Sequence, residues 1–219
     1  MGMYNLMMKD LKLGVHPMFF VMPFLTGALM LVPGWIYFIV LMYFCWITVP
    51  NMFGQFKAQN DLMFTSMMPV SKQDMVKARV AVLAGLEILH MVTAMIYGWF
   101  TIRLYPHLEY YFFPPHMGFW GMCFAMLAIF NLIFIPMYYK TAYKSGGATI
   151  ASITAATLFA AIAQWLGIRS PLLSDIFYGD GIHDGGLQVS ILIAGIVIFI
   201  AFTFIGYRIG MRRFLRVEV

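Results

Sequence analysis

The stretch LQVSILIAGIVIFIAFTFIGY at residues 187–207 contains no charged side chain and decides the class of fold. It is long enough to cross the hydrocarbon core of a bilayer as one helix, which takes about 20 mostly apolar residues. Five more stretches are comparable in length and apolar content, at 15–33, 35–53, 80–101, 118–139 and 148–168. The sequence therefore predicts an all-α polytopic membrane protein with six transmembrane helices. Pro33-Gly34 predicts a tight reversal between the first two.

The overall composition agrees with a membrane protein. Hydrophobic residues make up 62% of the 219 residues and charged residues 11%, whereas soluble globular domains have roughly 45–50% and about 25%. These values exclude a soluble enzyme, a disordered chain and a coiled coil, and they make membrane lipid the surroundings of the chain. The net charge of +5 indicates membrane topology, and we expect no nucleic-acid partner. Cys45 and Cys123 lie in apolar runs, so a disulfide framework is not expected.

Basic residues are divided unequally between the two sides of the predicted membrane. With the N-terminus in the cytoplasm, only Arg103 and Arg169 fall in outer loops. The other twelve are on the inside: Lys9, Lys12, Lys57, Lys72, Lys77, Arg79, Lys140, Lys144, Arg208, Arg212, Arg213 and Arg216. Because Lys and Arg concentrate in cytoplasmic loops, this distribution predicts that both termini are cytoplasmic.

The segment before the first span has an amphipathic pattern. Its apolar residues recur at helical spacing, and its polar residues are Asn5, Lys9, Asp10 and Lys12. This pattern predicts a short helix lying on the inner membrane surface. A frayed terminus is the alternative. The apolar stripe consists of Tyr4, Met7, Met8, Leu11 and Val15.

The longest cytoplasmic connection covers residues 54–79, GQFKAQNDLMFTSMMPVSKQDMVKAR. Ser71 followed by Asp74 predicts a helix start, because the Ser71 hydroxyl can cap the first turn and a carboxylate there is favourable. An apolar cluster precedes this start and suits either a groove on a partner protein or the lipid surface. It consists of Leu62, Met63, Phe64, Met67 and Met68.

Two phrases resemble a known family. NDLMFTSMMPVSKQDMVKAR (60–79) and IPMYYKTAYKSGG (135–147) are similar to elements of type-2 ATP-binding-cassette (ABC) transporter permeases. The closest kind is the short six-span bacterial one that includes the membrane subunit of the phenol-soluble-modulin exporter. The order of six spans also matches, so the resemblance treats 1–219 as one permease domain. The chain departs from it at Thr141-Ala142, where Phe-Gly is common, and at Met67-Met68, where Ser/Ala-Leu is common.

The resemblance implies a membrane subunit of an ATP-driven exporter in the bacterial cytoplasmic membrane. Amphipathic peptides are the implied cargo, and export of toxins or self-protection is the implied setting. The chain itself has no G-x-x-x-x-G-K-[ST] phosphate-binding loop, so it is not expected to be an enzyme or to hold a cofactor. ATP and Mg²⁺ are expected on a separate ATPase subunit, and a second permease copy or a homologous permease completes the transporter. The implied ATPase-coupling helix maps to Ser66, Met67, Met68, Pro69, Val70, Ser71, Asp74 and Lys77.

Polar residues within the predicted spans form a second group of candidates. Glu87 and His90 are three residues apart on one helix face. Asn131 and Gln164 are candidates either to be their partners or to bond across subunits. Charged groups at this depth usually face protein or water. We interpret the pair as an interhelical contact, a lining of the translocation pathway, or a proton or metal site. The alternative functions are an intramembrane enzyme or an ion or proton pathway using Glu87 and His90, and a channel or scaffold without an ATPase.

The predicted outer loops and the fifth span leave further alternatives open. Tyr110, Phe112 and Phe113 fit an interfacial aromatic belt or an external gate. Small residues in the span 148–168 fit close packing within one subunit or a dimer interface. The second outer loop is interpreted as a solvated acidic loop, for which a metal site is the weaker reading. Its residues are Asp175, Asp180, His183 and Asp184.

Overall fold

The computed structural model describes residues 3–141, 144–178 and 185–217, and all regular structure in these ranges is helical. The elements follow in one sequence along the chain. They are α1 (Met3–Lys9), η1 (Asp10–Gly14), α2 (Met18–Gly27), η2 (Ala28–Leu31), α3 (Phe38–Tyr43), η3 (Phe44–Thr48), α4 (Val49–Ala58), α5 (Asp61–Ser66), α6 (Lys72–Leu104), α7 (Met117–Thr141), α8 (Gly146–Arg169), α9 (Pro171–Tyr178) and α10 (Gly185–Phe214).

Five helices of the described ranges are long and apolar enough to cross a membrane. They are the continuous helix Phe38–Ala58, made of α3, η3 and α4, together with α6, α7, α8 and α10. They correspond to five of the six expected spans. The expected first span at 15–33 appears as the shorter helix Met18–Leu31. Its 14 residues rise about 21 Å, less than the roughly 30 Å of the hydrocarbon core, so a crossing by this segment stays a prediction.

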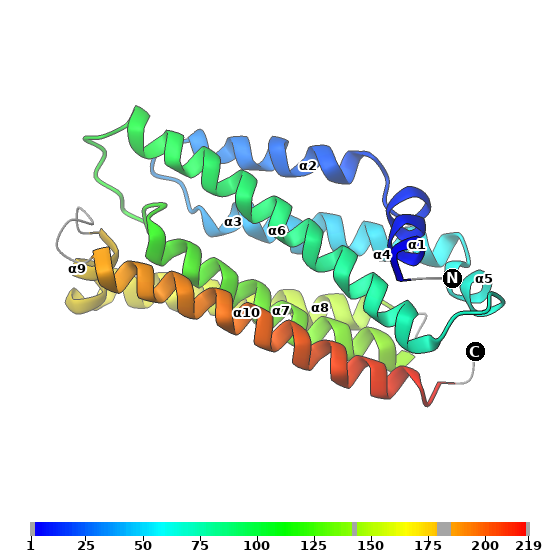
Figure 1. Ribbon diagram of the computed structural model, residues 1–219. Helices are drawn as coiled ribbons and strands as arrows, with labels where there is room; N and C mark the ends of the chain where they lie inside the picture. The colour runs from blue at the N-terminus through cyan, green and yellow to red at the C-terminus, as the bar shows by residue number, and fades with distance from the viewer. Residues whose placement is uncertain (1–2, 142–143, 179–184, 218–219) are drawn as a thin grey trace.

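The helices run side by side along one axis (Figure 1), with α2 against α6 and with α8 and α10 against α7. The reversal after η2 occupies residues 32–37, and Gly34 there takes a positive φ of 71° that suits glycine. The helix α1, the helix α5 and the end of α10 lie at one end of the bundle, and α9 lies at the other (Figure 1). The described parts of both chain ends therefore meet at the same end.

Close backbone contact joins α7 and α10. A Cβ atom added at Gly195 would collide with the backbone of Gly121. The small residues of α8 are also used inside the subunit, because Ser152, Ala156 and Ala160 are buried. Small side chains allow such close approach in a bilayer, where association depends on packing. The packing reading of the small-residue seam thus agrees with the structure.

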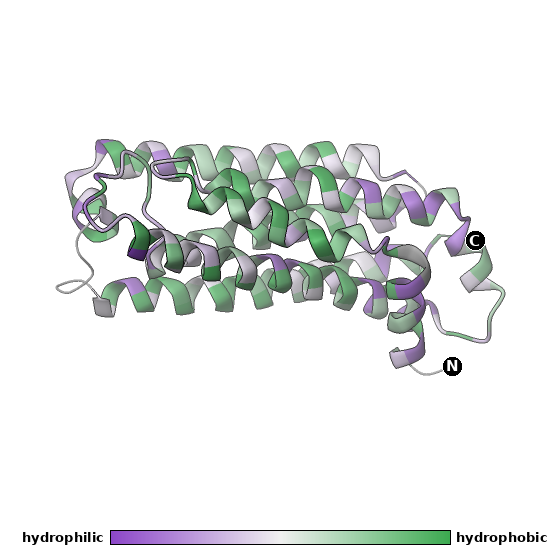
Figure 2. Ribbon diagram, turned by 90° about the horizontal axis from the view of Figure 1, so that it is seen from above, coloured by the Kyte–Doolittle hydropathy of each residue, from purple (hydrophilic) through white to green (hydrophobic). Residues whose placement is uncertain are grey.

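The outer surfaces of α8 and α10 remain apolar. Ile193, Val197, Ile200 and Phe204 of α10 are exposed, and Figure 2 shows hydrophobic residues along the bundle with hydrophilic ones gathered toward its ends. A continuous apolar exterior of this height requires an apolar environment. The chain is a multi-pass membrane protein.

Candidate coupling site and buried polar clusters

The candidate coupling segment is a turn between two helices. Asn60 takes the left-handed conformation with φ 48°, which Asn tolerates better than most residues, and it bends the chain between α4 and α5. After α5 ends at Ser66, a short turn leads to α6. The backbone N–H of Asp74 donates to Ser71 Oγ at 3.1 Å, and that hydroxyl donates to Asp74 Oδ2 at 2.7 Å. The predicted helix start is confirmed, but its helix continues without a break into the span as α6.

The coupling residues are mostly accessible. Met67 is 72% exposed, and Met63 and Phe64 of α5 are more than half exposed. Met68, Val70 and Asp74 are half-buried, whereas Ser66, Pro69, Ser71 and Lys77 are exposed. The predicted apolar cluster is therefore an outward surface at the end of the bundle that also carries α1 (Figure 1). The side chain of Leu62 lies outside the described structure.

Four charged side chains, one each from α1, η1, α5 and α6, meet beneath this surface. Arg79 of α6 pairs with Asp10 through Nε–Oδ2 and Nη2–Oδ1 contacts of 3.2 Å each, and its Nη2 also donates to Asp61 Oδ2. Lys9 Nζ donates to Asp61 Oδ1 and to Thr65 Oγ1, both at 2.6 Å. We name Lys9, Asp10, Asp61 and Arg79 the charge cluster. Its side chains are at most 10% exposed, and their formal charges sum to zero.

The charge cluster favours the ionised form of the Asp61 carboxylate. Burial alone would raise the pKa of Asp61, but the charge of Arg79 and hydrogen bonds from Lys9 and Arg79 outweigh it and hold the pKa below its ordinary value. The Arg79 guanidinium also lies 3.7 Å from the centre of the Phe56 ring, a cation–π contact. One group from α6 therefore contacts η1, α4 and α5.

The cluster corrects the expected amphipathic face of α1. The pattern placed Lys9 and Asp10 on the polar side with Tyr4 on the apolar side. In the structure Leu6, Asp10 and the Lys9 side chain are buried, and Tyr4 is exposed. Charges turn inward here because opposite charges from α5 and α6 meet them. Placement of α1 on a membrane surface stays a prediction.

Glu87 forms a second polar cluster inside the bundle. Asn131 of α7 donates through Nδ2 to Glu87 Oε2 at 2.7 Å and to Thr203 Oγ1 of α10 at 3.0 Å. Glu87 and Asn131 are both fully buried, and Glu87 Oε1 and Asn131 Oδ1 have no hydrogen-bond partner among the described residues. Asn131, one of the two candidate partners, is therefore the one that contacts Glu87. The contact ties α6, α7 and α10 together.

His90 belongs to a different set of contacts. Its Nε2 lies 3.0 Å from the Val40 carbonyl oxygen and 3.3 Å from Thr26 Oγ1. The carbonyl only accepts, so we assign the ring proton to Nε2. His90 thus joins α6 to α2 and α3, whereas Glu87 faces α7 and α10. Their shared helix face does not bring them into one site, and the described residues contain no group of three or more His, Cys, Asp or Glu that could hold a metal ion.

Gln164 lies apart from both intramembrane residues. It accepts a hydrogen bond from the Phe113 backbone N–H at 3.5 Å, and its amide lies 3.4 Å from the Tyr178 hydroxyl. Gln164 is therefore not a partner of Glu87 or His90 within the described subunit, because its side chain contacts the loop after α6 and α9 instead. Phe113 is buried there, Tyr110 is half-buried and Phe112 is only partly exposed. Asp180, His183 and Asp184 lie outside the described residues.

Comparison with known proteins identifies one family. A family model described as ABC-2 family transporter protein matches residues 5–214, nearly the whole chain. Comparison with curated proteins and with solved structures finds no match.

Proposed function

The chain belongs to the ABC-2 family of transporter proteins, and we propose that it works as the permease of an exporter, driven through residues 61–77 by a separate ATPase subunit. Family membership supports the membrane subunit of an ABC transporter in general. Such a subunit typically carries no nucleotide site of its own. ATP and Mg²⁺ bind to the ATPase in this proposal, and the two permease units are two copies of this chain or this chain and a homologue.

The exposed apolar surface of the coupling segment is the observation that carries the proposal. Met63, Phe64 and Met67 are more than half exposed beyond the apolar bundle. Large exposed apolar side chains in a projecting segment are typical of docking surfaces. Methionine adapts to a partner's surface because its side chain is unbranched and polarizable. These side chains enter a cleft of the ATPase.

The charge cluster supports a route from that docking surface to the spans. Asp61 begins the helix that carries Met63 and Phe64, and it binds Arg79 near the start of α6. A displacement of α5 therefore acts on α6 through a buried ion pair. Because η1, which directly continues α1, is bound to the same Arg79 through Asp10, α1 moves with the coupling segment. Lys9, Asp10, Asp61 and Arg79 are positioning residues in this mechanism.

The remaining parts of the proposal rest on sequence. Twelve basic residues fall on the side of α1 and two on the opposite side, which supports cytoplasmic termini in a bacterial cytoplasmic membrane. Met and aromatic side chains suit amphipathic cargo, and amphipathic peptides, including toxins or antimicrobial peptides, are the cargo class we propose. The direction is outward, as the resemblance implies.

The test is co-purification of this chain with candidate ATPase subunits. Met67→Glu is expected to abolish association and the ATP hydrolysis that depends on it, because a charge enters the docking surface. Met117→Glu is the matched control, since Met117 is also exposed but begins α7 at the opposite end. Equal loss with both variants, or no loss with Met67→Glu, would overturn the docking assignment.

A further inference from the structure

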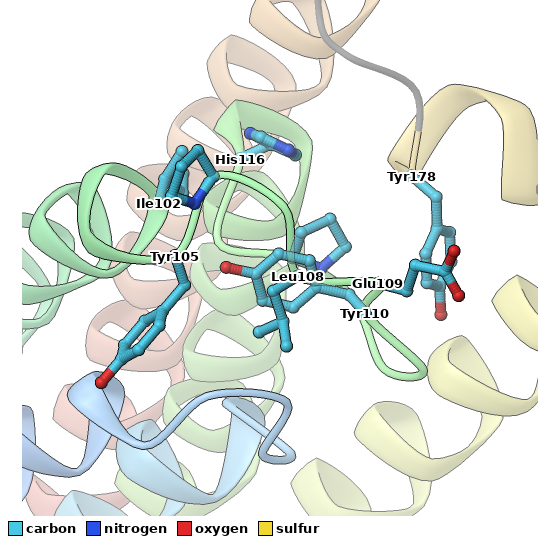
Figure 3. Close-up of a pocket in the computed structure, with 9 residues that line it drawn as sticks. Ile102, Tyr105, Leu108, Glu109, Tyr110, His116 and Tyr178 are labelled. Carbon is cyan, nitrogen blue, oxygen red and sulfur yellow. The ribbon is translucent and has the colours of Figure 1, made fainter.

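A cavity opens at the end of the bundle opposite α1, between the end of α6, the loop 105–116 and α9 (Figure 3). Its volume is about 490 Å³, within the roughly 300–1,000 Å³ of small-molecule sites. Three tyrosines, Glu109 and apolar residues such as Leu108 and Pro114 line it. The size suits an organic group larger than a metal ion.

Glu109 gives the cavity a negative charge that no described residue neutralises. No ion pair or hydrogen bond engages its carboxylate in the described structure. Arg103 and Arg169, the two basic residues expected on this side, do not line the cavity. Arg103 instead stacks over Trp99, with its guanidinium carbon 3.9 Å from the ring centre. His116 also lines the cavity. The unpaired carboxylate disfavours an anion and favours a cation.

The tyrosines add surfaces and a hydrogen-bonding group that suit a cation. Tyrosine rings attract ammonium groups through their negative faces. The Tyr178 hydroxyl is held in place, since it donates to the Tyr111 carbonyl at 3.0 Å. The Tyr110 hydroxyl is buried beside that of Tyr37, and a hydroxyl oxygen can accept a further hydrogen bond. In Figure 3, Glu109 and Tyr178 lie at one side of the cavity and Tyr105 at the other.

We infer that this cavity binds the ammonium group of an amphipathic molecule. The ammonium pairs with the Glu109 carboxylate and faces the tyrosine rings, while the apolar body lies against Leu108 and Pro114. The Tyr110 hydroxyl accepts a hydrogen bond from the bound N–H group. A metal ion fits poorly, because hard cations need several oxygen ligands and the described lining residues offer one carboxylate. Binding itself does not require an ATPase; that the ammonium belongs to exported cargo rests on the proposed function.

The experiment measures ligand affinity with the purified full chain in nonionic micelles. The probes are 2-phenylethylammonium, neutral 2-phenylethanol and anionic 3-phenylpropionate, titrated by saturation-transfer NMR with empty micelles subtracted. We expect the cation to bind at least about fivefold more tightly than the neutral probe. Only the cation gains a partly solvated charge pair with Glu109 and cation–π contacts with the tyrosine rings. The anion is expected to bind most weakly. Equal affinity for cation and neutral probe would overturn the inference.

Two single-residue variants test whether the cationic probe binds in this cavity. Glu109→Gln is expected to remove the preference for the cation, and Asp175→Asn is the matched control, because Asp175 is exposed on α9 but does not line the cavity. The same loss in both variants would overturn the site. Since Glu109 is exposed and its carboxylate makes no ion pair or hydrogen bond with the described residues, Glu109→Gln is expected to fold normally.

Competition separates two sources of the ammonium. Displacement of the cationic probe by phosphatidylethanolamine identifies a lipid headgroup. Displacement by an amphipathic peptide with a free α-amino group, and not by its N-acetylated form, identifies a peptide. If the simple ammonium probes do not bind and neither competitor binds, the site is refuted. Because these assays contain no ATPase, a negative result in the co-purification test leaves their outcome unchanged.

Discussion

Replacement of Asp61 by Asn tests the charge cluster with a side chain of nearly the same shape. The introduced amide would keep one oxygen as an acceptor but would lose the charge that meets Arg79 and Lys9. The remaining Lys9, Asp10 and Arg79 carry a net charge of +1 in a site whose side chains are at most 10% exposed. The variant therefore tests uncompensated buried charge rather than altered packing.

The expected destabilisation is large. Removing one partner of a buried ion pair costs about 3–5 kcal/mol, because the other charge stays buried without compensation. At about 2–4 °C per kcal/mol for a chain of this size, the unfolding midpoint is expected to fall by about 10 °C. Asp74→Asn is the control, since Asp74 is half-buried and contacts the Ser71 hydroxyl. Its loss is expected to be about 1 kcal/mol or less.

The two cysteines provide the assay. Cys45 and Cys123 are both buried and free, so a thiol-reactive fluorophore reacts only as the bundle opens. Fluorescence during heating reports the unfolding midpoint, and one heating rate must be used for all variants because such unfolding is often irreversible.

A second substitution checks the reason for the loss. Lys9→Met together with Asp61→Asn leaves Asp10 and Arg79 paired and restores a net charge of zero. The double variant is expected to recover at least about 2 kcal/mol relative to the sum of the single losses, a coupling typical of residues in one ion-pair network. Additive losses, or a loss with Asp61→Asn no greater than with Asp74→Asn, would show that charge balance does not hold these helices together.

Three more outcomes follow from the structure. The stabilisation by Asp61 is complete above its ordinary pKa near 3.8 and is lost as the pH falls through the lower folded value, so the midpoints of wild type and Asp61→Asn should converge only below that pH. Gly195→Ala should cost about 1–3 kcal/mol in the same assay, because its methyl group meets the α7 backbone; Gly186→Ala, with open space at its Cβ, should cost little. Asn131→Ala should lower the midpoint by the equivalent of about 1–3 kcal/mol by leaving Glu87 unpaired, whereas Glu87→Gln should retain both the midpoint and transport; loss of transport alone would favour a proton pathway.

Local patterns predicted the features that are local in the chain. Apolar runs located the five long helices because each run alone satisfies the length of a bilayer. The start of α6 was predictable because Ser71 and Asp74 are three residues apart. The first expected span shows the limit of this reasoning: its apolar run is long, but the chain leaves helical structure after Leu31.

Contacts between distant residues were not predictable in the same way. Arg79 meets Asp10 across 69 positions and Lys9 meets Asp61 across 52. No periodicity in one segment records such pairs, so the sequence assigned Lys9 and Asp10 to a solvated face. The only available signal was that Asp10 and Asp61 are acids beside predominantly basic cytoplasmic segments. The partner of Gln164 was not predictable for the same reason. Its side chain meets the backbone of Phe113, which is 51 positions away in the chain.

The helix α6 makes polar contacts near its start, in its middle and near its end. Near its start, Arg79 holds the charge cluster; in its middle, Glu87 and His90 bind opposite neighbours; near its end, Thr101 donates to the Met30 carbonyl at 2.6 Å. Its 33 residues span about 50 Å and include no proline, the usual cause of a sharp kink. Ile102 then lines the outer cavity. A displacement of the coupling segment therefore acts on one continuous helix that reaches the opposite end of the bundle, and in our proposal this links ATPase docking to release of the ammonium-bearing ligand.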